Sequence, residues 1–170
     1  IFGEFANLPS DGVDYVLFSY MGLLGWTYVS NGVTRASSSL VGQQALITKV
    51  YFPRVLLPLA SALSAIVDFS VAFVVGCALL IFYHVPLTWQ FLTMPLWLVL
   101  ISITISGIGL WISALSVYYR DFIYVLPFVV QVWLYITPVT YAVSLIPEKW
   151  LGLYSLNPMV GCIEGIRWAM

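Results

Sequence analysis

The sequence predicts an all-α membrane protein with several spanning helices, and three observations lead to this fold class. Of the 170 residues, 62% are hydrophobic and only 8% are charged, whereas a soluble domain carries about 25% charged residues. Four apolar segments are each long enough for the ~20 residues that a membrane-spanning helix needs. The run Val55–Phe69 lacks the alternation of apolar and polar residues that a membrane β-strand requires.

The composition also excludes other classes of protein. The net charge is −1 and no basic tract is present, so nucleic acid is not an expected partner. One histidine and two distant cysteines, Cys77 and Cys162, offer no metal-ligand spacing and no disulfide framework. We therefore expect no metal site, and we interpret both cysteines as small apolar packing residues.

Turn-forming or charged residues separate the predicted spans, which are 15–34, 55–83, 91–119 and 122–147. Pro9 and Gly12 precede the first span, and a turn at 84–88 separates the second from the third. Arg120 and Asp121 form a short polar hairpin between the third and the fourth. A longer connection, 35–54, lies between the first and the second.

The basic residues predict the orientation. Because connections alternate sides, four of them share one side: Arg35, Lys49, Arg54 and Arg120. Lys149 and Arg167 lie on the other side. Since Lys and Arg are enriched on the cytoplasmic face, the group of four is predicted to be cytoplasmic, and 1–14 and 148–170 external. One further span at each end would give six helices, so we expect the chain to be the middle of a longer subunit.

Small residues recur every four positions along the second predicted span: Ala60, Ser64, Asp68, Ala72 and Gly76. The third span carries a similar series: Ser102, Ser106, Gly109 and Ser113. Such stripes allow close approach of helices in lipid. Asp68 is the exception within its stripe, because an ionisable group inside a span is costly and usually faces protein or water. We favour a structural Asp68 satisfied by hydroxyls of a neighbouring helix, and a proton or ion relay is the alternative.

One face of the fourth predicted span carries aromatic residues and an amide: Tyr124, Phe128, Gln131 and Tyr135. Their spacing of four, three and four places them on one side of a helix. Pro127 and Pro138 interrupt the hydrogen-bond ladder of this helix. The face is suited to stacking on sugar rings and hydrogen bonding to their hydroxyls. Packing against other helices or lipid explains it equally well.

The segments on either side of the membrane show weaker helical patterns. Within 35–54, Leu40 and Leu46 keep an approximate helical spacing, which predicts a short amphipathic helix that lies in the interface or docks a cytosolic partner. In 148–170, Asn157 followed by proline is typical of a helix start. Glu164 and Arg167 have the spacing of a salt bridge. Trp150, Tyr154 and Trp168 suit an interfacial belt.

Four motifs resemble those of ABC-2 type permeases that export polysaccharides, in the same order along the chain. They are Ile47–Arg54 (ITKVYFPR) followed by Pro58-Leu59, then Tyr118–Asp121 (YYRD), Thr137–Tyr141 (TPVTY) and Leu156–Met159 (LNPM). The resemblance implies a six-helix subunit that forms a dimer with a second copy and pairs with separate ATP-binding subunits. The chain contains no GxxxxGK[ST] phosphate-binding loop, so ATP and Mg²⁺ would be bound by that partner.

The resemblance also implies roles for particular residues. The stretch 37–48 would be the coupling helix that contacts the ATP-binding subunit, through Ser38, Ser39, Leu40, Val41, Gln43, Gln44 and Leu46. The cytoplasmic motif residues would be Lys49, Arg54, Arg120 and Asp121. The fourth span would line the channel, so that its aromatic face contacts the glycan. The external gate would include Trp150, Tyr154, Asn157, Pro158, Glu164 and Arg167.

The function implied by the resemblance is transport rather than catalysis. The chain would belong to a multi-pass subunit of a bacterial plasma (inner) membrane exporter. This subunit would move a lipid-linked polysaccharide such as O-antigen, teichoic acid or capsule, in contact with membrane lipids. The alternatives are an ABC-2 exporter of a drug or lipid, and a proton-coupled transporter that uses Asp68.

Overall fold

The computed structural model describes residues 15–85, 88–139, 152, 154 and 157–169. This part of the chain is helical and contains no strand, which confirms the predicted all-α class for these residues. The elements are α2 (Tyr15–Gly42), α3 (Gln44–Lys49), α4 (Leu56–Phe82), the 3-10 helix η1 (Trp89–Thr93), α5 (Met94–Tyr118), α6 (Phe122–Ile136) and α8 (Pro158–Ala169).

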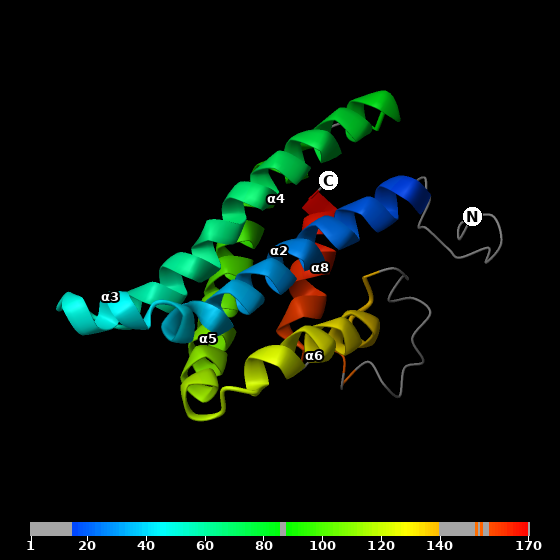
Figure 1. The fold of residues 1–170 in the computed structure, drawn as a ribbon. Helices are drawn as coiled ribbons and strands as arrows, with labels where there is room; N and C mark the ends of the chain where they lie inside the picture. The colour runs from blue at the N-terminus through cyan, green and yellow to red at the C-terminus, as the bar shows by residue number, and fades with distance from the viewer. Residues whose placement is uncertain (1–14, 86–87, 140–151, 153, 155–156, 170) are drawn as a thin grey trace.

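Helix α2 lies at the centre of the bundle, where it contacts α4, α5, α6 and α8 (Figure 1). Its buried apolar side chains are Leu17, Met21, Leu24, Trp26, Tyr28, Val29, Val33 and Ala36. Because neighbouring helices enclose it, α2 accommodates Ser, Thr and Asn residues that would be costly on a helix facing lipid.

Two helical segments are long and apolar enough to cross a membrane, Leu56–Phe82 and Trp89–Tyr118. Only 22% and 28% of their most apolar windows are buried within the chain, so most of their apolar surface faces outward. Outward apolar surface of this extent requires lipid or another protein. The other two predicted spans do not meet the same test, because α2 is less apolar and α6 has only 15 residues.

Helix α2 extends beyond the predicted span 15–34 and ends at Gly42. Serine hydroxyls in the added turns donate hydrogen bonds to carbonyl oxygens of the preceding turn, for example from Ser37 to Thr34 and from Ser39 to Ala36, both at 2.7 Å. Since these hydroxyls are satisfied inside the helix, the polar residues do not end it. The stretch 37–48, which the resemblance implies to be one coupling helix, is divided at Gln43. Its first half belongs to α2 and its second half to α3.

The turn after α4 confirms the predicted break that begins at His84. The amide of Val85 donates to the carbonyl oxygen of Leu80 (3.1 Å) and that of His84 to Ile81 (3.2 Å). His84 has φ 54°, the left-handed conformation that closes this type of helix end. Val85 also packs against the apolar cluster of Leu17, Met21 and Leu80, and an apolar contact of this kind often accompanies the motif.

Helix α6 is shorter than the predicted span 122–147, because it ends at Ile136. Thr137 already has an extended backbone, with ψ 133°. The ring of Pro138 disfavours a helical conformation at the residue before it, which explains the position of the end. Pro127 lies inside the helix without ending it. Residues 140–147 of the predicted span lie outside the described residues.

The predicted stripe of small residues on the second span faces α2 from Ser64 onward. The hydroxyl of Tyr20 donates to the carbonyl oxygen of Ala72 (2.8 Å). A Cβ at Gly76 would lie 3.3 Å from the side chains of Tyr20 and Met21. The predicted packing seam between α2 and α4 is therefore confirmed at Ala72 and Gly76, whereas Ala60, Ser64 and Asp68 are exposed.

The stripe on α5 also faces α2. The hydroxyls of Ser102 and Tyr28 are 2.8 Å apart, within hydrogen-bond distance. A Cβ at Gly109 would lie 2.7 Å from the Cβ of Ala36, so the backbones approach closely at this crossing. The small residues on α5 therefore form a second packing seam.

Helix α8 packs on α2 and α5 through one tightly fitted glycine, which supports a first prediction. A methyl group at Gly165 would overlap the rigid ring of Trp97, whereas one at Gly161 would meet no atom within 4 Å. We expect Gly165→Ala to lower the free energy of unfolding by about 1–3 kcal/mol, since the tight packing leaves no room for the methyl group. Thermal unfolding of the purified protein measures this effect.

Gly161→Ala is the matched control, because it adds the same methyl group to the same helix at a site with free space. Alanine also has the higher helix propensity, by up to about 1 kcal/mol, so this variant should be as stable as the unaltered protein or more so. Equal destabilisation by both substitutions would contradict the packing described here.

Candidate functional site

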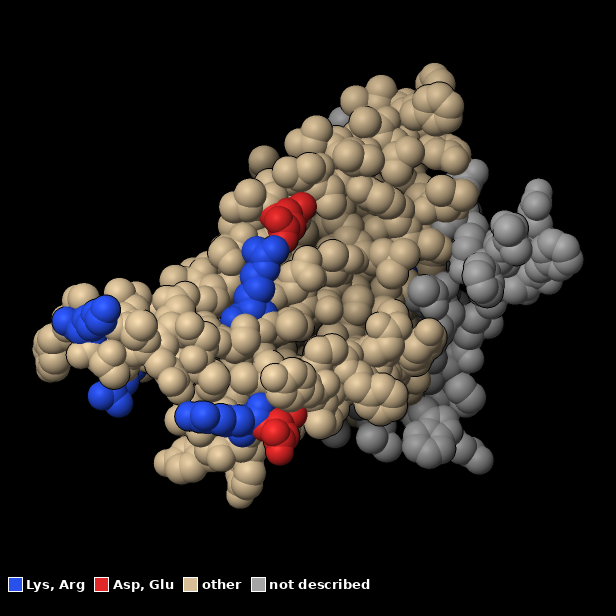
Figure 2. Space-filling model, viewed as in Figure 1, with Lys and Arg blue, Asp and Glu red and all other residues tan. Residues whose placement is uncertain are grey.

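Segments that are far apart in the sequence meet at one end of the bundle, here called the α3 end. Helix α2 ends there, α3 and the start of α4 follow, and the α5–α6 turn at Arg120 lies against them. Figure 2 shows Lys and Arg side chains toward α3 and toward the α5–α6 turn, with uncharged residues over most of the remaining described surface. The predicted grouping of Lys49, Arg54 and Arg120 at one end agrees with this arrangement.

Helix α3 projects from the bundle and has no buried residue. The chain turns at Gln43, whose amide donates to the carbonyl oxygen of Ser39 (3.2 Å). Thr48 hydrogen-bonds back to the carbonyl oxygens of Gln44 and Ala45, both at 3.1 Å. The side chain of Leu46 is 44% exposed. An exposed apolar residue on a short projecting helix is accessible to a partner protein.

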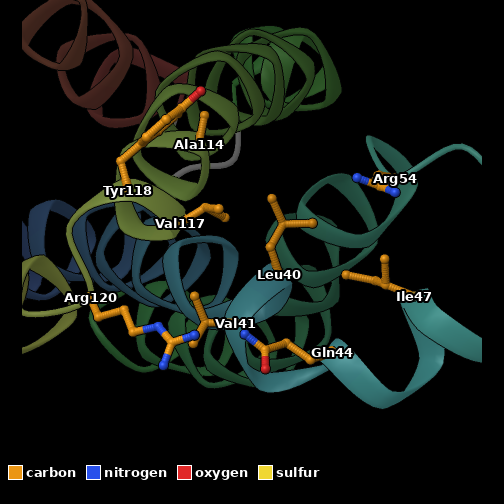
Figure 3. Close-up of a pocket in the computed structure, with 9 residues that line it drawn as sticks. All are labelled: Leu40, Val41, Gln44, Ile47, Arg54, Ala114, Val117, Tyr118 and Arg120. Carbon is orange, nitrogen blue, oxygen red and sulfur yellow. The ribbon is translucent and has the colours of Figure 1, made fainter.

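A cavity of about 380 Å³ lies between the end of α2, α3 and the end of α5. Its walls are largely apolar, and two guanidinium groups line it (Figure 3). The lining residues are Leu40, Val41, Gln44, Ile47, Arg54, Ala114, Val117, Tyr118 and Arg120. The structure thus places part of the predicted coupling set beside two residues of the predicted cytoplasmic motif.

A second, more polar hollow of about 330 Å³ lies on the other side of the end of α2. It is lined by Arg35, Ser38, Ser39, Gly42, Gln43, Ser61 and Ser64. The predicted coupling residues therefore divide between two surfaces. Leu40, Val41 and Gln44 line the first cavity, whereas Ser38, Ser39 and Gln43 line the second.

Asp68 forms an ion pair with Arg35 across the α2–α4 seam. Arg35 also donates to the hydroxyl of Ser64 (3.2 Å), one turn from Asp68. Both charged side chains are about half-exposed, at 43% for Arg35 and 47% for Asp68. The expectation that hydroxyls of a neighbouring helix satisfy Asp68 is wrong, because a guanidinium takes that place.

Sequence reasoning missed this partner because Arg35 follows the predicted end of the first span and was assigned to the connection. The signal that identifies Arg35 as the partner of Asp68 is the continuation of α2 beyond Thr34. If α2 runs past Thr34, as it does, Arg35 lies one residue further along and can face the neighbouring helix. Few charged residues are available within this apolar region, so pairing between them becomes the natural expectation.

The aromatic face predicted on the fourth span lies on α6 and points away from the bundle. Tyr124 is 84% exposed, Phe128 71% and Tyr135 70%, and Gln131 is also exposed. The opposite side of α6 carries its buried residues, Leu126 and Val130. The four predicted residues therefore share one exposed face of this helix, as their spacing indicates.

The external segment is described at residues 152 and 154 and from 157 onward, and Tyr154 is partly buried. The Asn157 side chain accepts a hydrogen bond from the amide of Met159 (3.1 Å), which confirms the predicted start of a helix at Pro158. Asn157 also donates to the hydroxyl of Thr137 (3.1 Å), so it ties α8 to the end of α6. Trp150 lies outside the described residues.

Arg167 binds the end of α6 rather than Glu164. It donates to the carbonyl oxygens of Pro138 (3.0 Å) and Val139, and its guanidinium lies 3.8 Å from the centre of the Phe18 ring. Among the described residues the one ion pair is Arg35–Asp68, so the predicted Glu164–Arg167 pair is not formed. Backbone carbonyls left free where α6 ends explain this, because they are strong acceptors for an arginine.

The described part of the chain shows no group of three or more His, Cys, Asp or Glu side chains that could hold a metal ion. Both cysteines are free thiols. Cys162 is buried in α8, and burial raises the pKa of its thiol. A neutral, buried thiol is consistent with packing.

Comparison with known proteins identifies the family of the chain. Residues 1–170 match the model of the family described as ABC-2 type transporter. The chain is 28% identical over 164 residues to the O-antigen export system permease protein RfbA of Myxococcus xanthus, which covers 95% of this chain and 61% of that protein. Two proteins of the same name from Klebsiella pneumoniae are 28% and 26% identical over 156 residues, covering 91% of this chain and 60% of each.

The chain spans about three fifths of the length of these curated relatives. The family match extends over every element described above, from α2 to α8. The chain therefore belongs to the ABC-2 type transporter family.

Proposed function

We propose that this chain is part of the permease subunit of an ATP-driven exporter that moves a lipid-linked polysaccharide across the bacterial plasma membrane. The observation that carries the proposal is the family match over the whole chain, together with relatives named as O-antigen export permeases. Membership of this family makes the chain a membrane domain of a transporter rather than a catalytic domain.

In the proposed arrangement, the spans near 15–34, 55–83, 91–119 and 122–147 cross the membrane as four of the six helices of the subunit. The α3 end faces the cytoplasm, since its basic residues follow the distribution expected there. The opposite end carries α8, which contacts α2 and α5. We assign α8 and the rest of 148–170 to an external gate, and the aromatic face of α6 to the channel wall.

Coupling to a separate ATP-binding subunit would take place at the α3 end. Support comes from the exposure of the predicted coupling residues on α3, where Leu46 projects as an apolar contact. A second copy of the subunit would complete the transporter. Sugar rings would stack on Tyr124, Phe128 and Tyr135, and Gln131 would hydrogen-bond to glycan hydroxyls.

The alternative of a proton-coupled transporter through Asp68 receives no support from the structure. Asp68 pairs with Arg35 in the seam between two packed helices, an arrangement suited to holding α2 against α4. No observation favours a drug or another lipid as the cargo over a glycan.

Copurification of the ATP-binding subunit with the full-length permease tests the proposal. We expect Leu46→Asp to weaken copurification about 30-fold, because a central apolar contact of an interface contributes about 2 kcal/mol. Polysaccharide at the cell surface should fall in parallel.

Leu92→Asp is the matched control, since it makes the same change at another exposed leucine. Leu92 lies in η1, which follows α4 at the end of that helix away from α3. It should retain the ATP-binding subunit. Full copurification with Leu46→Asp would contradict the placement of the coupling surface, and an unaltered permease that recovers no ATP-binding subunit would contradict the proposed function.

A further inference from the structure

The cavity at the α3 end combines two features that rarely occur together on a surface facing only water. One wall is apolar, formed by Leu40, Ile47 and Val117. Two guanidinium groups, Arg54 and Arg120, lie on opposite sides of it in the view of Figure 3. A cavity of this kind fits an amphiphile that carries a negative charge.

Neither of these two arginines forms an ion pair with a carboxylate among the described residues, where Arg35–Asp68 is the one salt bridge. Asp121 is adjacent to Arg120 in the sequence but does not pair with it. Two cations that share one cavity repel each other unless an anion lies between them. The cavity therefore favours a ligand that brings negative charge.

The position of the cavity along the bundle indicates which kind of molecule supplies the negative charge. Exposed tyrosines occur at this end of the bundle. Tyr118, which lines the cavity, is 84% exposed, Tyr119 next to it is 67% exposed, and Tyr51, between α3 and Arg54, is fully exposed. Tyrosines that project outward at the end of an apolar helix are typical of the membrane–water interface. Helix α5, which ends at Tyr118, belongs to one of the two segments able to cross a membrane. The cavity thus lies at the depth of the lipid headgroups.

We propose that this cavity binds the phosphate group of an acidic phospholipid from the adjoining leaflet. Arg54 and Arg120 would hold the phosphate, because a guanidinium matches phosphate oxygens with paired hydrogen bonds. The apolar wall at Leu40 and Val117 would contact the glycerol and the first methylene groups of the lipid. Basic pockets between helices at the membrane surface bind acidic headgroups in this way. The inference does not depend on which cargo the protein exports.

Such a lipid would connect the projecting helix α3 to the rest of the bundle. The cavity is lined by the end of α2, by α3, by Arg54 in the connection before α4, by the end of α5 and by the α5–α6 turn. A bound phosphate bridging Arg54 and Arg120 would hold the connection before α4 against the start of α6. The acidic lipid would thereby stabilise the same end of the molecule that is proposed to contact the ATP-binding subunit.

Native mass spectrometry of the full-length protein, titrated with phosphatidylglycerol or phosphatidylcholine, tests the proposal. We expect retained phosphatidylglycerol and little phosphatidylcholine. Each of Arg54→Gln and Arg120→Gln should weaken phosphatidylglycerol retention about fivefold, from the attraction of one basic residue to an acidic membrane surface. Ala114→Phe fills the cavity while both arginines remain, and it should also reduce retention.

Lys49→Gln is the matched control, since it removes one positive charge at the same end from a residue that does not line the cavity. Thermal unfolding in phosphatidylcholine alone shows that each variant remains folded. Equal loss of retention with Lys49→Gln would overturn the proposal, because it would show a general effect of surface charge.

Two further results would overturn it. Competition by inorganic phosphate at the same concentration as the lipid would show a site for the free anion. Unchanged lipid retention in the Arg54→Gln/Arg120→Gln double variant, combined with loss of the ATP-binding subunit, would show that the cavity receives a group of the partner protein.

Discussion

Replacing Asp68 with asparagine is expected to lower the free energy of unfolding by about 1 kcal/mol. The substitution leaves the guanidinium of Arg35 without its carboxylate partner on helices packed within a membrane domain. An unpaired arginine costs about 2.5–3.5 kcal/mol at the centre of a membrane helix. Arg35 lies near the end of α2 and is about half-exposed, so its side chain can extend toward the interface and the cost is well below that figure. Thermal unfolding in detergent micelles measures the effect.

The double variant Arg35→Gln/Asp68→Asn separates pairing from simple loss of side chains. It removes both charges together, so it should be more stable than either single variant, with a coupling energy within the 0.5–3 kcal/mol found for residues in contact. Ser64→Ala is a milder control, because it leaves the ion pair in place. It removes the 3.2 Å hydrogen bond from Arg35 and the 2.7 Å bond that Ser64 donates to Ser61, and at this exposed site it should cost about 0.5 kcal/mol. Additive losses from the two single variants would contradict the pairing.

The same variants address the proton-coupled alternative. If the ion pair is structural, the double variant should export polysaccharide once it is folded, since both charges have been removed together. A stable double variant without any transport would favour a direct role of Asp68 in the transport cycle.

Removal of the aromatic face of α6 is expected to affect transport rather than folding. We predict that the triple variant Tyr124→Ala/Phe128→Ala/Tyr135→Ala lowers polysaccharide at the cell surface about tenfold or more. Even 0.5 kcal/mol per ring, the lower end for an aromatic contact, amounts to this factor for three rings. Because the three side chains are at least 70% exposed, little packing within the chain is lost.

Val125→Ala and Val129→Ala provide the matched control on the same helix, at exposed apolar positions of a neighbouring face. We expect this double variant to leave polysaccharide at the cell surface unchanged, as measured by antibody or lectin binding to whole cells. Equal export by the aromatic variant and the control would contradict a channel role. Loss of the dimer in the aromatic variant would instead assign this face to contacts between two copies.

The two experiments examine different properties of neighbouring helices. The pair of Arg35 and Asp68 lies in a seam where the chain packs on itself, so its loss should appear as lower stability. The aromatic face of α6 lies where the chain makes few contacts with itself, so its loss should appear in function alone.

Much of the helical framework could be predicted from local patterns. Runs of apolar residues place α4 and α5 within a few residues of their ends, and the break at His84 follows from turn chemistry. The start of α8 follows from Asn157 and the proline after it. The C-terminal ends of α2 and α6 could not be predicted from the apolar pattern. Serine hydroxyls satisfied within the helix carry α2 past Thr34, while Pro138 ends α6 before the apolar run is complete.

Local patterns were sufficient to predict the membrane class, the family resemblance, the stripes of small residues and the aromatic face of α6. Each of these depends on length, spacing or motif within one segment. The packing of the helices was needed to show that Arg35 pairs with Asp68, 33 positions away, and that Arg54 and Arg120 line one cavity with Leu40. Contacts between such distant residues depend on how far each helix is rotated about its axis and shifted along its neighbours. That register is set by the packing of α4, α5 and α8 around the buried side chains of α2, which no local pattern contains.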